Sequence, residues 1–272
     1  MASPTEITPT QLARLIGTPL APVLIDVRID EDFDADPHLI PGAIRYRFED
    51  MDRCAEDLRG RSAIVYCQKG LKISQGAAAL LRVHGIAAET LEGGHVAWRD
   101  AGLPMVAAAK LPKPQAKGYS LWVTRHRPKI DRIACPWLIR RFVDPNAQFL
   151  FVSPSQVLNV ADRFAATPFD VENVFWSHRG DTCTFDTMIT EFGIGHEALD
   201  RLATIVRGAD TDRHELAPES AGLLAASLGL SRMYRDDLEQ MEAGFLLYDA
   251  FYRWARDATG ETHDWPGAGG AA

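Results

Sequence analysis

The sequence predicts two domains, an α/β domain with a parallel sheet flanked by helices, followed by an α-rich α+β domain. At 272 residues the chain is about twice the usual size of a domain, so we expect two units that each bury a core. Before residue 107, short apolar runs alternate with helical patterns, which is typical of a parallel sheet. From about residue 182 onward the apolar spacing is helical, which makes the second domain α-rich.

A change in composition marks the boundary between the domains. Between residues 107 and 118 the hydrophobic periodicity stops, and two prolines, three lysines and a glycine follow one another. We interpret this stretch as a linker. The predicted organisation is therefore a first domain over 1–106, a linker over 107–118 and a second domain over 119–272.

Individual elements follow from local patterns. The first domain contains apolar β-rich runs at 23–27 and 63–66 and a helical pattern from Ser74 to His84. In the second domain, residues 120–124 and 148–152 are expected to be strands, and 131–142 a helix. The stretch from Arg232 to Asp257 is expected to form one long amphipathic helix. Its apolar face consists of Leu238, Met241, Phe245, Tyr248, Tyr252 and Ala255.

Composition and charge exclude several classes of protein. The chain has a net charge of -8, and no apolar run approaches the roughly 18 to 20 residues of a membrane-spanning helix. The first residues lack a basic segment followed by an apolar one, so we expect a cytoplasmic protein that does not contact a membrane. The charge is uneven, because residues 110–141 carry nine basic side chains and one acidic one. The acidic balance elsewhere argues against a partner nucleic acid.

A cysteine at a strand-to-helix turn is the first candidate site. Cys67 follows the apolar run 63–66 and begins a glycine-bearing loop that leads into a helix. Loop amides, together with Lys69 and Lys72, are expected to lower the pKa of the thiol and to receive an anionic substrate. The alternative is a buried structural cysteine.

Four motifs around this loop carry a resemblance. In chain order with Cys67 they are Leu24-Ile-Asp-Val-Arg28, His38-Leu-Ile-Pro-Gly-Ala43, Leu91-Glu-Gly-Gly-His-Val-Ala-Trp98 and Ala101-Gly-Leu-Pro104. Residues 7–106 closely resemble a single-domain rhodanese. The resemblance implies a parallel sheet flanked by helices, and a reaction without a cofactor in which a cysteine persulfide carries sulfane sulfur. Its donor would be a small anion such as thiosulfate, and its acceptor a thiol or cyanide.

The resemblance also implies roles for individual residues. Cys67 and Lys72 are the predicted catalytic residues: Cys67 is the nucleophile, and Lys72 stands where the family loop frequently has an arginine. Asp26 and Arg28 resemble the family's structural ion pair, and Arg28 is also counted among the substrate-binding residues. The remaining predicted substrate-binding residues are Gln68, Lys69, Gly70 and Leu71. Phosphatase chemistry is disfavoured, because the phosphate-clamping arginine expected six positions after the cysteine is replaced by Ile73. The role of Cys54, a resolving thiol or a buried bystander, stays open.

The second domain contains two further candidate sites. Arg127, Lys129 and Arg132 lie at the start of the predicted helix 131–142 and would suit an oxyanion. A solvated basic face, or pairing with the acidic remainder of the domain, is the alternative. His178, Cys183, Asp186 and Asp210 offer N, S and O ligands for Zn or Fe. Helix capping by Asp181 and Thr182, and a turn cap by Asp210, are the structural alternatives. Cys135 is expected to be a packed thiol.

The second domain also carries a resemblance. Its strings are Arg127-Pro-Lys-Ile-Asp-Arg-Ile-Ala-Cys-Pro-Trp-Leu-Ile-Arg-Arg-Phe142, His178-Arg-Gly-Asp-Thr-Cys-Thr-Phe-Asp186, Ile205-Val-Arg-Gly-Ala-Asp210 and Gly222 to Ser231. Residues 119–258 look like the C-terminal domain of the ChrB chromate-resistance family, which implies chromate as a ligand. Some relatives have a winged-helix front half, whereas this chain has a rhodanese-like half, which disfavours direct DNA binding.

Together these features predict a sulfurtransferase coupled to a domain that handles an oxyanion or a metal in chromate resistance. The alternative is a non-catalytic chromate or metal sensor, or another regulatory binding protein.

Overall fold

A five-stranded parallel sheet forms the centre of the N-terminal half in the computed structural model, which describes residues 5–116 and 118–261. Its strands lie in the order β1-β6-β5-β2-β4, and every pairing is parallel. β2 and β5 are buried along their whole length, which explains why both appear in the sequence as unbroken apolar runs. The bounds are β1 Glu6–Ile7, β2 Val23–Asp26, β4 Ala43–Arg45, β5 Ala63–Tyr66 and β6 Ala88–Leu91.

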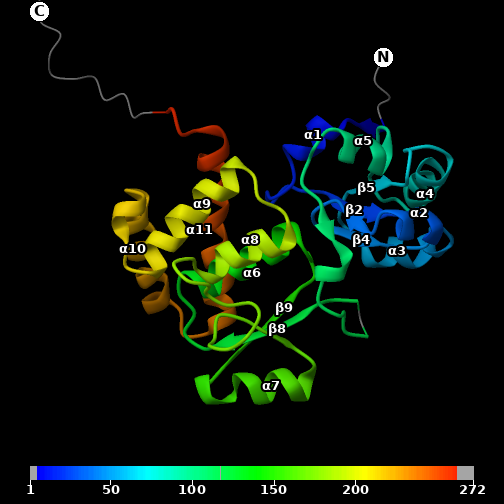
Figure 1. Ribbon diagram of the computed structural model, residues 1–272. Coiled ribbons are helices and arrows are strands. Elements are labelled where there is room, and N and C mark those ends of the chain that lie inside the picture. Colours follow the sequence, from blue (N-terminus) through cyan, green and yellow to red (C-terminus); the bar gives the residue numbers. More distant parts are fainter. Residues whose placement is uncertain (1–4, 117, 262–272) are drawn as a thin grey trace, which may run out of the picture.

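Helices cover both faces of this sheet (Figure 1). α3 and α4 pack on one face, where α4 buries Ser74, Ala77, Ala78 and Leu81 at helical spacing. A two-stranded antiparallel ribbon of β3 and β7 lies beside the sheet. The bounds are α1 Pro9–Ala13, α2 Asp30–Ala35, β3 His38–Leu39, α3 Met51–Asp57, α4 Lys72–Val83, α5 Gly94–Asp100 and β7 Val106–Ala107. The predicted parallel α/β fold of this half is confirmed.

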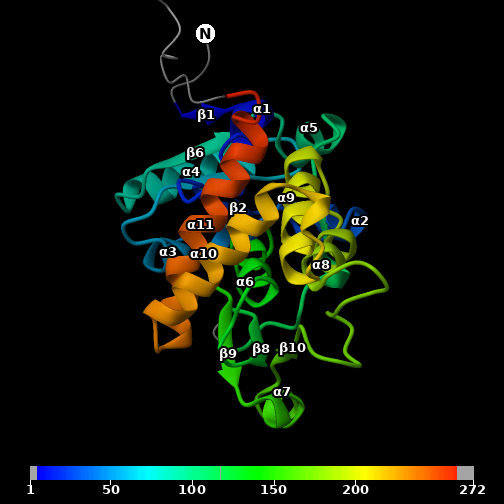
Figure 2. The same cartoon turned by 90° about the vertical axis from the view of Figure 1, so that its left-hand side faces the viewer.

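The C-terminal half begins with a small parallel sheet in the order β10-β8-β9. Trp122 on β8 faces α6, whereas Val123 faces α7, so the two helices cover opposite faces of the sheet (Figure 2). The bounds are β8 Leu121–Arg125, α6 Asp131–Phe142, β9 Gln148–Val152, α7 Val157–Phe164 and β10 Thr167–Pro168. The two strands and the helix predicted here from local pattern are confirmed.

Four further helices make this half α-rich, as predicted. They are α8 Thr184–Phe192, α9 Glu197–Asp210, α10 Glu219–Met233 and α11 Asp237–Asp257. α8, α9 and α11 pack against α6, and α10 packs against α9 and α11. No helix in the described ranges is both long enough and apolar enough to cross a membrane.

The single helix expected from Arg232 to Asp257 is wrong at its N-terminal end. α10 ends at Met233, and Asp236 caps a new helix by accepting hydrogen bonds from the amides of Leu238 and Glu239. Leu238 lies in the first turn and is 48% exposed. The other five apolar residues predicted for this face are buried, together with Gln240 and Gly244.

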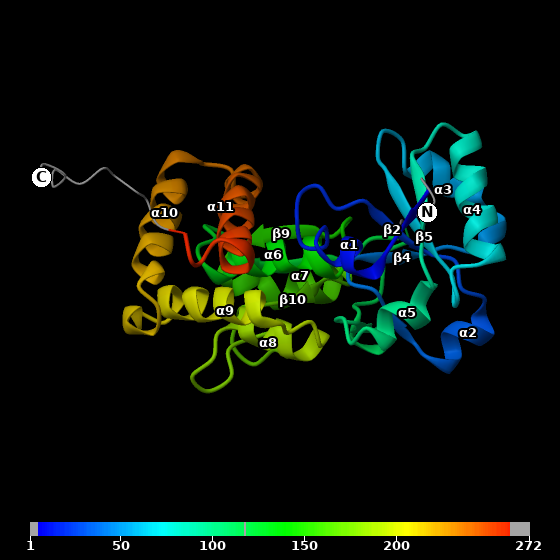
Figure 3. The same ribbon diagram turned by 90° about the horizontal axis from the view of Figure 1, so that it is seen from above.

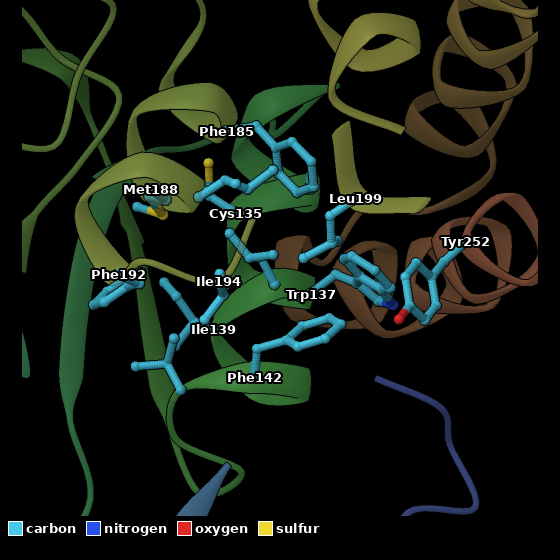
Figure 4. Close-up of a cluster of buried hydrophobic side chains, with 14 of the residues drawn as sticks. Cys135, Trp137, Ile139, Phe142, Phe185, Met188, Phe192, Ile194, Leu199 and Tyr252 are labelled. Atoms are coloured by element: carbon cyan, nitrogen blue, oxygen red, sulfur yellow. The ribbon is translucent and has the colours of Figure 1, made fainter. Parts of the chain in front are cut away.

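The two halves pack directly on each other (Figure 3). Trp137, Phe142 and Tyr252 lie in one buried cluster (Figure 4), and this cluster continues into Leu12 and Ile16 of the N-terminal half. The backbone amide of Gly42 donates to the carbonyl of Phe142 over 2.7 Å. Each half also has a buried cluster of its own, around β5 and α4 in the N-terminal half and between β8 and α7 in the C-terminal half, so the shared cluster adds to the cores expected from length.

Candidate functional site

Cys67 lies at the carboxyl end of β5, in the loop that leads into α4. Its thiol is 5% exposed, and Sγ lies 3.3 Å from the hydroxyl oxygen of Ser74. The carbonyls of Cys67 and Gln68 accept hydrogen bonds from the amides of His95 and Val96, at the start of α5. The loop is therefore fixed to the neighbouring turn by its own backbone.

Close approach of two glycines shapes this loop. Gly70 has φ +68°, and a Cβ there would lie 2.5 Å from the carbonyl oxygen of Leu91. Gly94 has φ +60°, and its Cβ would lie 2.2 Å from the carbonyl oxygen of Cys67. Real Cβ atoms do not approach backbone atoms so closely, so only glycine fits at either position.

Hydrogen bonds favour the thiolate form of Cys67. Burial opposes ionisation and is the largest single influence, but it is outweighed by hydrogen bonds from the Ser74 hydroxyl and from the amides of Ser74, Lys69 and Leu71. The net effect lowers the pKa of the thiol below its usual value. Loop amides were predicted to act in this way, whereas the contribution of the Ser74 hydroxyl was not recognised in the sequence.

The cations near Cys67 have two different environments. Lys69 and Lys72 are exposed on the loop and in the first turn of α4. Arg28 is buried, and its guanidinium donates to both carboxylate oxygens of Asp26 and to the carbonyls of Asp36 and His38. Because these partners use the guanidinium, Arg28 fits the structural pair, and the assignment of Arg28 to substrate binding is corrected.

The other cysteines are poor nucleophiles. Burial, with the charge of Asp57, raises the pKa of Cys54 to about 12. Burial, with neighbouring carboxylates, also raises the pKa of Cys135 and of Cys183 well above the usual value. Cys67 is therefore the cysteine whose environment favours a nucleophilic thiolate.

A histidine and three aspartates cluster in the C-terminal half. His178 Nε2 lies 3.4 Å from Asp131 Oδ2, 3.4 Å from Asp170 Oδ1 and 3.2 Å from Asp210 Oδ2. The side chains of Asp131 and Asp170 are 1% and 8% exposed, whereas that of His178 is 41% exposed. The carboxylates of Asp131 and Asp170 are thus buried, and the cluster is open to solvent at His178.

The groups of this cluster shift one another's pKa. Burial raises the pKa of Asp131 to about 7, and the Asp210 carboxylate adds to the rise. Contacts with Asp131, Asp170 and Asp210 raise the pKa of His178 to about 12. Negative charge is therefore concentrated around the ring nitrogen of His178.

The predicted metal ligands separate into two groups. His178 and Asp210 belong to the cluster with Asp131 and Asp170. Cys183 instead forms the N-cap of α8, where its amide donates to Asp186 and closes a capping box. Asp186 also pairs with Arg207 over 2.8 Å. The helix cap predicted for Asp181 and Thr182 is therefore made by Cys183.

Sequence reasoning missed Asp131 and Asp170 as members of the cluster. Asp131 was visible as the one acidic residue of a basic segment, which was a usable clue. Asp170 has no comparable local pattern, although it follows β10 at φ +51°.

The three cations predicted to bind an oxyanion do not converge on one site. The Arg127 guanidinium donates to the carbonyls of Ser231 and Tyr234. Arg132 lies 3.4 Å from Asp170 and donates to the carbonyl of His126. Lys129 precedes α6 and is partly exposed. Pairing with the acidic remainder of the domain, the alternative considered for this segment, describes Arg132 better.

Comparison with known proteins matches the two halves separately. Residues 8–101 match the rhodanese-like domain, and residues 122–255 match the domain described as ChrB, C-terminal domain. Protein ChrB of Cupriavidus metallidurans is 33% identical over 155 residues, which cover 56% of this chain. The match covers 46% of that relative, so the chain spans less than half of its length.

Solved structures that resemble part of the chain include rhodanese proteins. A rhodanese-related protein from Thermoplasma volcanium is 24% identical, with a TM-score of 0.33, and the match covers 38% of this chain and 97% of that one. A thiosulfate sulfurtransferase from Pseudomonas aeruginosa is 27% identical, with a TM-score of 0.33, and the match covers 37% of this chain and 19% of that one.

Proposed function

The chain joins a rhodanese-like domain to a ChrB C-terminal domain, and on this premise we propose a sulfurtransferase in which Cys67 carries sulfane sulfur as a persulfide. The observation that supports it most directly is the setting of Cys67. Its sulfur lies within a ring of loop amides and beside the Ser74 hydroxyl, which favour an anionic sulfur.

The reaction has two balanced steps. The Cys67 thiolate attacks the outer sulfur of thiosulfate, a new S–S bond forms, and sulfite leaves with the electron pair of the broken S–S bond. A thiolate or cyanide then attacks the outer sulfur of the persulfide, which returns Cys67 as a thiolate. No cofactor takes part in either step.

The same amides that favour the thiolate would hold the persulfide anion. The exposed ammonium groups of Lys69 and Lys72 flank the loop and would attract the anionic donor. Lys72 supplies a point charge, whereas arginine in this place would supply a planar fork, so donor preference differs from that of an arginine-bearing loop. Gln68, Gly70 and Leu71 complete the proposed substrate loop.

We place this reaction in the cytoplasm, in the handling of chromate or a metal. The four cysteines are free thiols, as reducing compartments maintain them. The C-terminal domain would supply the ligand-binding part, and the cluster around His178 favours a cation over an oxyanion there. A shared chain keeps the two parts at a high effective concentration.

A regulatory protein is the second candidate, in which the C-terminal domain senses chromate or a metal without turnover at Cys67. The buried position of the Cys67 thiol favours this alternative. It predicts saturable binding to the full chain together with an absence of thiocyanate formation.

The test is mass spectrometry of the full chain after treatment with thiosulfate. We expect an adduct of about 32 Da on Cys67, removed by cyanide with release of thiocyanate. Cys67→Ser should abolish both, and Cys54→Ser, a buried cysteine of the same half, should leave both unchanged. A wild-type chain with no adduct and no thiocyanate would exclude sulfur transfer from thiosulfate.

A further inference from the structure

His178, Asp131 and Asp170 meet at the carboxyl end of the small parallel sheet in the C-terminal half. Asp131 begins α6 just after β8, and Asp170 lies two residues after β10. β8 is the central strand, and the helices that follow β8 and β9 cover opposite faces of the sheet. In parallel sheets, ligands bind outside the carboxyl ends of strands where the chain reverses its direction of winding. The cluster therefore lies where this fold places a ligand.

The distances around His178 Nε2 are long for hydrogen bonds. The contacts of His178 Nε2 with the three carboxylates measure 3.2–3.4 Å, longer than a good N–H···O bond. One ring nitrogen carries a single proton, so it satisfies only one of these oxygens. Ligands bonded at about 2.0–2.1 Å to a tetrahedral ion lie roughly 3.3–3.4 Å apart. The spacing of the Nε2 and the oxygens of Asp131 and Asp170 agrees with such a shell.

Other groups hold the carboxylates in orientation. The Oδ2 of Asp131 accepts a hydrogen bond of 2.6 Å from the amide of Thr184, at the start of α8. The Oδ1 of Asp170 accepts one of 2.9 Å from the Thr184 hydroxyl. Arg125 and Arg132 lie 3.1 and 3.4 Å from the other oxygen of Asp170, which leaves Oδ1 directed at His178. Such outer partners are a regular feature of metal ligands.

The segment that carries Asp131 is also fixed. Gln240 donates over 2.6 Å to the carbonyl of Pro128, and the Tyr248 hydroxyl donates over 3.0 Å to that of Ile130. Both donors come from α11. The Asp131 carboxylate is thus held in place before a ligand arrives.

Asp131 also lacks a permanent cationic partner. Within the described ranges, no lysine or arginine nitrogen lies within 4.0 Å of its carboxylate, and His178 is the basic group in contact with it. Burying a carboxylate costs free energy unless a countercharge lies close to it, and a divalent ion bound in place of the His178 proton would supply a larger countercharge than the imidazole does.

From these observations we propose that His178, Asp131 and Asp170 bind one divalent first-row transition ion, with Asp210 beside them as an additional carboxylate. One imidazole with carboxylate oxygens suits Zn²⁺, Fe²⁺ or Mn²⁺ better than the softer, thiolate-preferring ions. Three protein ligands and an opening at His178 leave coordination positions for water or for an oxygen of an anion. This proposal deepens the cation-handling part of the proposed function and does not depend on sulfur transfer.

Cobalt(II) is the probe, because its visible absorption reports coordination number without any enzyme assay. The full chain, treated with a chelator and dialysed, is titrated with Co²⁺ and then with Zn²⁺ as competitor. We expect wild type to bind one ion per chain. Loss of an outer partner weakens metal binding by roughly 10–100-fold, and His178→Gln, which removes a ligand, should weaken it by more than that. Asp181→Asn, an exposed acid on the same loop, is the matched control and should bind like wild type.

Thermal unfolding provides a second measurement that does not need a spectrum. Zn²⁺ should raise the Tm of wild type and Asp181→Asn but not of His178→Gln, since an ion that binds only the folded state stabilises it. His178 is partly exposed, so its replacement leaves the core intact. The absence of saturable binding to wild type, or equal affinity in wild type and His178→Gln, overturns the proposal in favour of a protonated His178 in an ion-pair cluster. Cys67→Ser should bind the ion normally, so failure of sulfur transfer and failure of the metal site are separately visible.

Discussion

Ser74 contacts Cys67 from the first turn of α4, and this contact separates Cys67 from the other three cysteines. The hydroxyl lies 3.3 Å from Sγ and 3.1 Å from the carbonyl of Leu71, so its one proton has two acceptors. Ionisation of Cys67 makes the sulfur the stronger acceptor. The hydroxyl is therefore a positioning group for the thiolate.

Replacement of Ser74 by alanine tests this contact. Because the hydrogen bond lowers the pKa of Cys67, its loss should raise that pKa and move the pH profile of alkylation to higher pH. At neutral pH we expect alkylation to slow by about fivefold, which corresponds to a hydrogen bond of about 1 kcal/mol. Residue-resolved mass spectrometry with iodoacetamide measures the rate. Ser62→Ala, an exposed serine just before β5, is the control, and an unchanged profile in Ser74→Ala would contradict the role given to the hydroxyl.

Short backbone contacts between two turns shape the loop that carries Cys67. Residues 67–71 and residues 91–96 pack against each other through amides, carbonyls and glycines. The geometry of the anion-binding loop therefore depends on β6 and α5 as well as on β5 and α4.

Gly94→Ala tests this dependence. A Cβ would overlap the carbonyl oxygen of Cys67, and the left-handed φ adds strain. We expect a loss of about 2–3 kcal/mol of unfolding free energy, together with loss of persulfide formation. Chemical denaturation and the thiosulfate assay measure the two effects. Gly85→Ala is the matched control, because φ is +79° there and nothing lies within 4 Å, so only the backbone strain of about 1 kcal/mol remains. Equal effects of the two substitutions would show that close packing at Gly94 is unimportant.

The N-terminal and C-terminal halves share a buried hydrophobic cluster, in addition to a cluster that belongs to each half alone. Phe142, at the end of α6, is 2% exposed and lies in the cluster that reaches both halves. A Cβ on Gly17 would lie 2.3 Å from the ring of Phe142, which shows how closely the N-terminal half approaches it. The ion pair of Lys110 with Glu191 adds a polar contact between the halves.

This continuity predicts cooperative unfolding of the full chain. Phe142→Ala should cost about 3–5 kcal/mol and should lower the stability of both halves together. Hydrogen exchange followed by mass spectrometry measures the two halves separately. Val83→Ala, at a side chain that is 80% exposed, should change stability by less than about 0.5 kcal/mol. Faster exchange in the C-terminal half alone would mean that the shared core does not couple the halves.

Most of the elements that were predicted from local pattern lie where they were expected, and the errors have local causes. The alternation of strands and helices, the loop at Cys67 and the helix at 131–142 all follow from neighbouring residues. The break before α11 was missed because the apolar spacing continues across it, although Asp236 is a good N-cap residue. Cys183 was an unexpected cap, since cysteine is a rare residue there.

Local patterns in the chain identify the two kinds of domain and the loop that carries Cys67, because periodicity, turn residues and motif order depend on residues close together in the sequence. The tertiary structure alone brought Asp131, Asp170, His178 and Asp210 together, and it added the carbonyls of Asp36 and His38 to the partner already expected for Arg28. Such convergence depends on the order of strands in a sheet and on how helices pack over it. Those are long-range properties that no local pattern encodes.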